Sequence, residues 1–231
     1  MSPKRADTGP AVPGAIWLRE RAPGRGGGLT RERIAEATVA LLDADGAAGL
    51  SLRRLAEALG VHATTLYWHV ATRDDLLDLA LDAVFGEIPE AGGPGVDWTG
   101  DITGYMHGLR RALLRHPWSA ALAGSRPLTG PNALARAESV HVALTGAGFR
   151  GAELSAAAAA ISNLVIGSVA VETSWQHEGE APARRAVDEH LRRHAERYPT
   201  LAAHAPTLDD AWDDHFGRAV RFLVDGLAAA R

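Results

Sequence analysis

Helical spacing of apolar residues, with no strand-like alternation, is the feature that most constrains the fold of this chain. Apolar residues recur three and four positions apart, which is the period of a helix with one buried face. No Asn-Gly hairpin signal interrupts the pattern. The chain therefore predicts an all-α fold, with helices near residues 31–45, 51–59, 62–69, 73–88, 97–116, 118–124, 129–147, 150–176, 182–197 and 207–230.

The first three predicted helices form a head. Thr30 and Ser51 are N-cap candidates for the first two helices, and Gly60 ends the second. A short third helix follows, with one buried position at Leu66. The inward-facing residues that would fix the angle of this pair are Leu55, Ala56, Leu59, Val61 and Leu66. A capped helix, a glycine turn and a short second helix are typical of the helix-turn-helix motif.

The second helix of this motif carries residues with no apolar reason to be buried, namely Ala63, Thr64, Thr65, Tyr67 and His69. Short side chains let a helix approach base edges in the major groove, and a threonine methyl can contact a thymine methyl. Tyr67, His69 and Arg53 are suited to hold phosphates. We expect this surface to bind double-stranded DNA. The alternatives are edge packing for Tyr67 and Trp68, and ordinary solvated side chains for Arg53 and His69.

Residues 73–88 predict a connector helix between the head and the rest of the chain. Thr72 is its N-cap candidate, and Asp74 and Asp75 lie in the first turn, where the helix dipole favours acids. The helix is apolar over most of its circumference, as expected of a helix covered on two sides. A Gly/Pro-rich stretch follows at 89–95. We therefore divide the chain into an arm (1–28), a helix-turn-helix head (29–75) and a helical body (76–231).

Residues 1–28 are rich in proline and glycine and predict a disordered arm, because they offer too little apolar surface to become ordered. Residues 1–33 hold seven basic side chains against three acidic ones, although the whole chain has a net charge of -4. Such an arm can add attraction to phosphates that weakens with salt. It lacks the apolar segment of a secretory signal, so we expect a cytoplasmic protein.

Two helices of the body, 150–176 and 207–230, are apolar over a wide arc. A second copy that contributes the same pair would complete a four-helix bundle, so we expect a homodimer. Residues 154–171 carry no charge and just reach the length of a membrane span. Their alanine, serine, asparagine and glycine content favours a helix inside a soluble bundle, and we expect no membrane partner.

The stretch from Leu29 to Leu81 resembles the N-terminal domain of the TetR (tetracycline-repressor) family of transcriptional regulators. The resemblance rests on Gly-Val-His-Ala-Thr-Thr-Leu-Tyr-Trp-His-Val at 60–70 and Arg-Asp-Asp-Leu-Leu at 73–77, and it continues more weakly through the body. It implies a ligand-responsive regulator, most simply a repressor, with a helical ligand-binding and dimerisation body. It also implies DNA contacts for Arg53, Ala63, Thr64, Thr65, Tyr67, His69 and Arg73. Ala63 stands where the relative has an amide that reads a base, so we expect a different operator.

The body departs from the tetracycline binders at one position. Their magnesium-tetracycline site uses a histidine just before Leu-Gly-Thr-Arg-Pro, whereas this chain reads Leu-Ala-Gly-Ser-Arg-Pro at 122–127. Leucine cannot ligate a hard cation, so we expect a small-molecule effector other than magnesium-tetracycline, and an apolar molecule can still occupy the same cavity. Candidate lining residues are Tyr105, Trp118, Leu122, Ser125 and Asn163, and for each an ordinary core position is the alternative.

The residues give no support for catalysis. The chain has no cysteine, which excludes disulfides, thiolate zinc sites and thiol nucleophiles. His190 and His194 have a chelating spacing, but they enclose Leu-Arg-Arg and lack the glutamate of a zinc-protease motif. The glycine run 26–28 lacks the Lys-Ser/Thr of a phosphate loop. We expect no metal, no cofactor and no enzyme; the remaining alternative is an all-α ligand-sequestering or protein-interaction dimer whose head does not read DNA.

Overall fold

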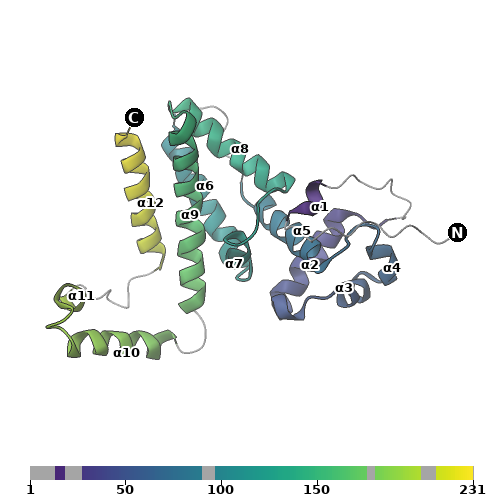
Figure 1. The fold of residues 1–231 in the computed structure, drawn as a ribbon, viewed down its shortest axis with the longest axis horizontal. Helices are drawn as coiled ribbons and strands as arrows, with labels where there is room; N and C mark the ends of the chain where they lie inside the picture. Colours follow the sequence, from purple (N-terminus) through teal and green to yellow (C-terminus); the bar gives the residue numbers. More distant parts are fainter. Residues whose placement is uncertain (1–13, 19–27, 90–96, 176–179, 204–211, 231) are drawn as a thin grey trace.

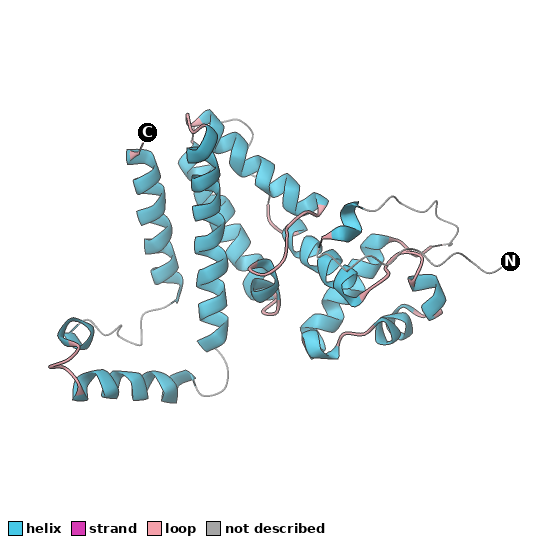
Figure 2. Ribbon diagram, in the orientation of Figure 1, coloured by secondary structure: helices cyan, strands magenta, loops and turns pink. Residues whose placement is uncertain are grey.

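The computed structural model describes residues 14–18, 28–89, 97–175, 180–203 and 212–230. Every regular element in these ranges is a helix (Figure 2). In chain order they are α1 (Ala15–Leu18), α2 (Arg31–Asp45), the 3-10 turn η1 (Ala47–Gly49), α3 (Leu52–Leu59), α4 (Ala63–Leu66), α5 (Arg73–Gly86), α6 (Trp98–Arg115), α7 (Ser119–Ala123), α8 (Pro131–Gly146), α9 (Gly151–Trp175), α10 (Glu180–Arg193), α11 (Pro199–Ala203) and α12 (Trp212–Ala229). The all-α expectation is confirmed.

Two hydrophobic cores divide the molecule into a head and a body, which lie beside each other and are joined by α5 (Figure 1). The head core draws on α1 to α4 and on α5 as far as Ala80. The body core begins at Leu81 and draws on the rest of α5 together with α6 to α9 and α12. The connector is therefore buried in both cores, and the packing boundary falls after Ala80, later than the expected boundary at residue 75.

The helix ends in the head follow from capping residues that are visible in the sequence. The hydroxyl oxygens of Thr30 and Ser51 each accept a hydrogen bond, at 3.2 Å, from the backbone N–H three residues further on. Gly60 ends α3 with a φ of 65°, a left-handed conformation that glycine adopts without strain. Thr72 and Asp75 form a capping box at the start of α5. These contacts explain why α2, α3 and α5 start where the sequence predicts.

The connector α5 also has a polar side that its leucine pattern conceals. Asp75, Asp78 and Asp82 are all buried. Asp75 accepts the backbone N–H of Ala71 at 2.7 Å, and Asp82 accepts that of Ala133 at 2.9 Å, at the start of α8. A buried carboxylate is stable only when donors surround it. The aspartates therefore attach α5 to the elements on both sides of it.

The expectation of a wholly disordered arm is wrong for residues 14–18. This segment, which we call the N-terminal strap, contains α1 and lies against α5 (Figure 1). Ile16 is 2% exposed within the head core, and the Gly14 N–H donates to Asp78 Oδ2 at 2.7 Å. Burial of one large apolar side chain and one buried hydrogen bond offset the entropy of ordering this segment. The expected disorder of residues 1–13 and 19–27 concerns positions outside the described residues.

The body is a helical bundle around α9, which packs against α6, α7, α8 and α12 (Figure 1). By length and composition α9 is apolar enough to cross a membrane, yet only 22% of its most apolar stretch is buried within this chain. A single chain thus leaves one side of an apolar helix uncovered. The helices α10 and α11 pack against each other and extend away from the bundle (Figure 1).

Some predicted boundaries are wrong. The helix α4 is shorter than 62–69, because residues 67–69 form a turn in which the His69 N–H donates to Leu66 O at 2.8 Å. The helix predicted at 182–197 runs from Glu180 to Arg193, and Pro199 then begins α11, which was not predicted. Of the last predicted helix, 207–230, residues 207–211 lie outside the described residues.

Candidate nucleic-acid interface and coupling site

The helices α3 and α4 form the two-helix motif expected from the sequence, at the end of the head away from the body (Figure 1). Leu55 of α3 and Leu66 of α4 are fully buried in the head core. In the turn between the helices, the Val61 N–H donates to Ala56 O at 3.0 Å. These contacts fix the angle between α3 and α4, so α4 is presented on a rigid support.

The outer face of α4 and the turn after it are open to solvent. Ala63 and Thr64 are exposed, Thr65 and His69 are half-buried, and Tyr67 is 58% exposed. The short side chains at 63–65 allow close approach of the α4 backbone to another surface. Tyr67 and His69 place hydrogen-bonding groups beside that contact. Reading of base edges in a major groove, flanked by phosphate contacts, requires this arrangement.

Trp68 belongs to the same exposed surface, although the sequence analysis did not assign it there. It is 78% exposed, so the alternative that it packs at the edge of the head is wrong. Together with the exposed Tyr67 it puts two neighbouring aromatic rings on this surface. Its signal in the sequence is its place between Leu66 and Val70, which occupy the buried positions on either side.

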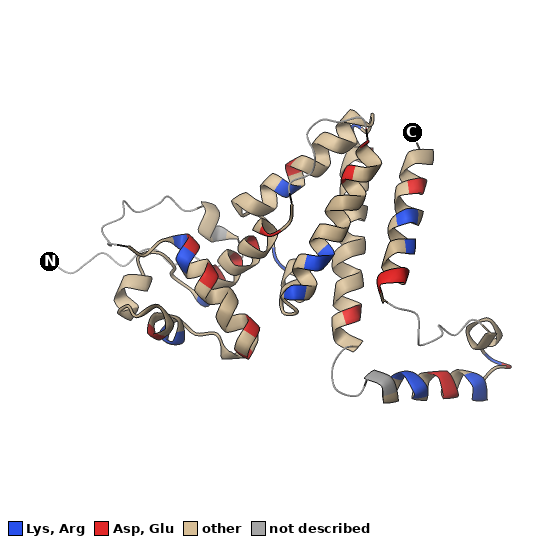
Figure 3. Cartoon of the chain, turned by 180° about the vertical axis from the view of Figure 1, so that it is seen from behind, with Lys and Arg blue, Asp and Glu red and all other residues tan. Residues whose placement is uncertain are grey.

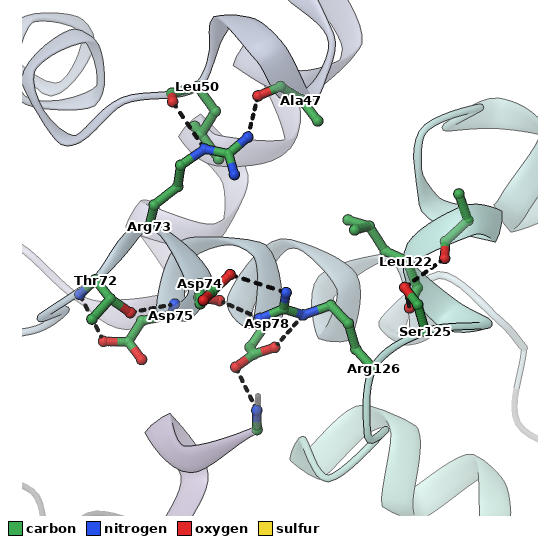
Figure 4. Close-up of polar contacts among 12 residues, drawn as sticks. Ala47, Leu50, Thr72, Arg73, Asp74, Asp75, Asp78, Leu122, Ser125 and Arg126 are labelled. Atoms are coloured by element: carbon green, nitrogen blue, oxygen red, sulfur yellow. Dashed lines mark hydrogen bonds and ion pairs between the residues drawn. The ribbon is translucent and has the colours of Figure 1, made fainter. Parts of the chain in front are cut away.

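The two predicted contact residues outside this surface, Arg53 and Arg73, differ from each other in their surroundings. The Arg53 side chain is 88% exposed and pairs with Glu57 at 3.0 Å. An exposed pair of this kind is weak and leaves the guanidinium able to change partner. Arg73 donates instead to the carbonyl oxygens of Leu50, at 3.2 Å, and Ala47 (Figure 4). In this structure Arg73 holds the start of α5 on the loop before α3.

Charge on the head is mixed. Basic residues lie in the first turns of α2 and α3, and acidic residues follow along both helices, so Figure 3 shows both signs on the head. The chain as a whole has a net charge of -4. Attraction of the α4 surface to phosphates therefore comes from a few local groups and not from the field of the whole protein.

Ion pairs join α5 to the loop after α7. Arg126 donates from Nε to Asp78 Oδ1 at 2.9 Å and from Nη1 to Asp74 Oδ1 at 3.1 Å (Figure 4). Burial opposes the charge on Arg126, but the hydrogen bonds and charges of Asp78 and Asp74 outweigh it and raise the Arg126 pKa. Any movement of this loop relative to α5 must carry these contacts along or break them.

A second junction joins α2 of the head to the start of α7. The buried His116 lies between two carboxylates, with Nδ1 2.8 Å from Asp43 Oδ1 and Nε2 3.0 Å from Glu87 Oε1. The Trp118 indole N–H donates to the same Asp43 oxygen at 2.7 Å. This junction is not visible in the sequence, since Asp43 and His116 are 73 positions apart and neither stands in a motif.

A small cavity lies inside the body between α5, α6, α8 and α9. Its volume is about 80 Å³, and most of its lining is apolar, with Tyr105, His141 and Ser162 as polar members. Burial raises the pKa of Tyr105, in spite of its hydrogen bond to Ser162 and the charge of Arg136. A drug-sized ligand requires a pocket of about 300–1,000 Å³. This conformation therefore has no room for such a ligand in the cavity.

Two family models match the chain, one over most of the head core and the other over most of the body core. The model described as "Bacterial regulatory proteins, tetR family" matches residues 34–80, and "Tetracyclin repressor-like, C-terminal domain" matches residues 91–231. The chain belongs to the TetR family. It is therefore a helix-turn-helix DNA-binding transcriptional regulator with a ligand-binding C-terminal domain, and the TetR family is not enzymatic.

Relatives with this TetR architecture match the chain over nearly its whole length. A transcriptional regulator of the helix-turn-helix type from Saccharopolyspora erythraea is 51% identical over 226 residues, which cover 97% of this chain and 96% of that protein. The transcriptional repressor DrrR1 of Streptomyces coeruleorubidus is 32% identical over 225 residues, which cover 92% of this chain and 83% of that protein. The crystal structure of the TetR family protein ActR of Streptomyces coelicolor, in complex with actinorhodin, matches with a TM-score of 0.80 and 28% sequence identity. The match covers 89% of this chain and 98% of that chain.

The predicted effector-lining residues of this TetR body have different surroundings among the described residues. Of the five, Tyr105 lines the internal cavity. Trp118 is held toward the head by Asp43, Leu122 packs against both cores, and the Ser125 hydroxyl donates to Ala121 O at 2.8 Å. The role of these three as effector-lining residues stays a prediction; in this conformation α7, beside which they lie, packs onto α5 and α9.

Asn163 is also absent from the lining of the internal cavity. It lies on a different face of α9, where it borders an open groove of about 460 Å³ between α9 and α12. Trp212 and Phe216 line the same groove, which is largely apolar. Its walls are the two helices for which the sequence predicts contact with a second copy.

Among the described residues of this TetR protein, no group of three or more His, Asp or Glu side chains is arranged to hold a metal ion. The rings of His190 and His194 lie 4.3 Å apart by their centroids. His194 Nδ1 lies 2.8 Å from His190 O, which is an interaction within one exposed helix. The pair therefore fits a solvated helix face better than a chelating site.

Proposed function

We propose that this TetR-family regulator is a homodimeric repressor that a small-molecule effector releases from a palindromic operator. Two relatives support this finer assignment, since DrrR1 is a repressor and ActR binds actinorhodin in its crystal structure. The observation on which the assignment depends is the exposed outer face of α4, supported from within by the buried Leu55 and Leu66.

Each residue of that face has a role in operator binding. Ala63, Thr64 and Thr65 approach base edges, where their methyl groups meet thymine methyls. Phosphate contacts come from Tyr67, Trp68, His69 and Arg53. Arg73 orients the start of α5, and a direct DNA contact by Arg73 requires that it first release the carbonyl oxygens of Ala47 and Leu50.

The dimer forms through α9 and α12. Val171 on α9 and Phe222 on α12 are 50% and 74% exposed in the single chain, and the apolar groove beside Asn163 lies between the same helices. Covering these surfaces with the same pair from a second copy removes apolar area from water. Two α4 helices then enter successive major grooves about 34–36 Å apart, on a near-palindromic site.

The switch depends on a difference in effector affinity between two conformations. The internal cavity of about 80 Å³ must enlarge to take an effector, so the effector binds a conformation other than this one. The loop that carries Arg126 borders the body and is bonded to Asp74 and Asp78 of the connector. Its displacement moves α5 and changes the spacing of the two heads. An effector with equal affinity for both conformations would not change the equilibrium between them.

The N-terminal arm adds to DNA binding through its charge. Its basic residues, Lys4 and Arg5 among them, add phosphate attraction that weakens with salt. A repressor of this kind must reach its operator, so the proposed function includes a cytoplasmic location.

A titration against DNA tests this function. Wild-type protein is titrated, across a salt series, with duplex from the intergenic region upstream of its own gene and with random duplex of equal length. We expect the upstream duplex to bind about 10³-fold more tightly or better. Equal affinity for the two duplexes would contradict the proposal and favour a dimer that does not read DNA.

Matched variants locate the contact on α4. Tyr67→Ala and Thr64→Ala should each weaken specific binding about tenfold, because each removes a contact of roughly 1–2 kcal/mol. Tyr198→Ala and Thr200→Ala make the same chemical changes near α11 and should leave the affinity unchanged. Equal losses in all four variants would show that α4 is not the reading element.

A further inference from the structure

The N-terminal strap contacts three separate parts of the molecule. Its Gly14 N–H donates to Asp78 Oδ2 of the connector at 2.7 Å, in a buried position. Its Gly14 carbonyl oxygen accepts the hydroxyl of Thr129, in the body, at 3.4 Å. Its Ile16 side chain fills a place in the head core. A segment of five residues therefore bridges the head, α5 and the body.

The side chain after Ile16 adds a second contact with the head. The Trp17 ring lies 5.9 Å from the Arg31 guanidinium at the start of α2, a cation–π distance. Trp17 is half-buried and also forms one wall of a groove of about 530 Å³ between α2, α5 and the start of α8. The strap thus lies across the junction at which the head would rotate against the body.

Asp78 is shared between the strap and the loop after α7. One of its oxygens accepts from Gly14 and the other accepts from Arg126 at 2.9 Å (Figure 4). Its side chain is buried, so each donor matters to the stability of the carboxylate. The proposed switch moves the loop of Arg126 relative to α5. The strap is hydrogen-bonded to Asp78 of α5 and to Thr129 of that loop.

Gly14 occupies a position that other residues cannot take without strain. Its φ is +81°, which L side chains rarely adopt, and a Cβ there would lie 2.6 Å from Thr129 Oγ1. A methyl group at this position requires the Thr129 side chain or the strap to shift, and the positive φ strains the substituted backbone in either case. Gly14→Ala therefore loosens the strap without altering any residue of α3 or α4.

We propose that the strap is a positioning element of the switch, which fixes the head against the body in the conformation that binds the operator. This inference rests on the proposed repressor function. The internal cavity is too small for a drug-sized effector in the strapped conformation, so we assign that conformation to the effector-free state, in which a repressor binds DNA. Contacts that exist in only one conformation shift the equilibrium toward it.

The test compares Gly14→Ala with wild type in the full-length protein, by titration with the upstream duplex across a salt series. We expect binding to weaken about three- to tenfold, the effect of losing one or two hydrogen bonds. The slope of log affinity against log salt should stay unchanged, because no phosphate contact is lost. Hydrogen exchange of residues 14–18 should quicken in the variant, which verifies that the strap is released.

The matched control is Gly104→Ala on α6, where a Cβ meets no atom within 4 Å and φ is not in the left-handed range. It should bind like wild type. Thr129→Val, which removes the hydroxyl that contacts Gly14, is a second variant and should weaken binding in the same direction.

Three results would overturn the inference. The first is unchanged affinity in Gly14→Ala although exchange shows a released strap, which would make the strap a merely structural element. The second is tighter DNA binding, which would make it inhibitory. The third is a reduced salt slope, which would make it a phosphate contact. Failure of the repressor function itself is distinguishable, because wild-type protein would then not prefer the upstream duplex.

Discussion

Leu66 and Val70 are fully buried, and Tyr67 and Trp68 between them face solvent. This alternation within one short turn separates residues that hold the head together from residues that contact a partner. Substitutions on the two sides should therefore act on different measured quantities, one on the free energy of unfolding and the other on operator affinity.

Trp68→Ala should weaken operator binding about tenfold, because it removes an indole N–H and a large contact surface from the phosphate side of the interface. The midpoint of thermal unfolding should stay within about 1 °C of wild type, since the ring is 78% exposed in the free protein. The measurements are the duplex titration and a thermal unfolding curve of the same samples.

Leu66→Ala is the opposite case and serves as the contrast. Removal of this fully buried side chain should lower the free energy of unfolding by about 2–5 kcal/mol. A Trp68→Ala protein that melts early but binds the operator normally would contradict the outward role of Trp68.

At the scale of residues, the sequence predicts what depends on local pattern. Thr64 and Tyr67 are exposed as expected, because the spacing of Leu66 and Val70 decides which side of the turn is buried. It does not predict the contact between Asp43 and His116, or the hydrogen bonds that Trp118 and Ser125 make in this structure. Those contacts depend on how α7 packs against distant elements, and no local spacing records that.

Helices are predictable where caps and periodicity agree. Thr30, Ser51 and Thr72 mark the starts of α2, α3 and α5 correctly, because each side chain satisfies a backbone N–H of its own first turn. The strap was not predictable, since one isoleucine within a stretch rich in proline and glycine gives no period. Its order comes from Asp78, which belongs to another element.

The ion pairs of Arg110 tie α6 to α9 and α12, and their two acids differ in burial. Arg110 donates to Glu172, whose side chain is 6% exposed, and to Asp213, whose side chain is 83% exposed. Arg110→Ala should lower the free energy of unfolding by about 3–5 kcal/mol, because it removes a partner from a buried carboxylate. Asp213→Asn should cost less than about 1 kcal/mol. Urea unfolding measures both, and equal losses would contradict this account of the junction.

His107 should make the stability of the body depend on pH. Its ring packs edge-on against the ring of Phe216 of α12, with 5.2 Å between the ring centroids. Burial and the charges of Arg111 and Arg110 lower its pKa below the usual value of 6.5. Below about pH 6.5 the unfolded chain binds a proton that the folded protein resists, so stability falls as the pH falls. Above that pH both states hold a neutral ring, and the contribution is constant.

The comparison of wild type with His107→Gln between pH 8 and pH 5.5 isolates this effect. The free-energy difference between the two proteins should be constant at the upper end and should move in favour of His107→Gln below about pH 6.5. A difference that stays flat, or that moves in favour of wild type, would show that the folded protein does not disfavour the charged ring.

At the scale of the whole molecule, the two-part division and the connector are predictable from sequence, because α5 is apolar on most sides and is followed by a Gly/Pro-rich stretch. The place where one core gives way to the other is not predictable, since Ala80 and Leu81 are both buried apolar residues and only the side chains packed on them show to which core each belongs. The apolar α9 is explained by the same reasoning once a second copy covers its open side.

Phe222→Asp should convert the dimer into a folded monomer, because it places a charge on the proposed contact surface of α12, where the ring is 74% exposed in the single chain. Sedimentation equilibrium should show the mass fall from that of two chains to that of one, with the helical circular dichroism unchanged. Leu134→Asp on α8, also at an exposed apolar residue, is the control and should remain dimeric. A dimeric Phe222→Asp protein would exclude this surface.

Hydroxyl-radical footprinting on the operator tests the central claim most directly, which is that two α4 helices read adjacent turns of one DNA face. The account predicts two protected tracts related by a two-fold axis, with centres about 10–10.5 base pairs apart. Both tracts should disappear together in Phe222→Asp. A single protected tract, or the same double footprint from a monomeric variant, would contradict it.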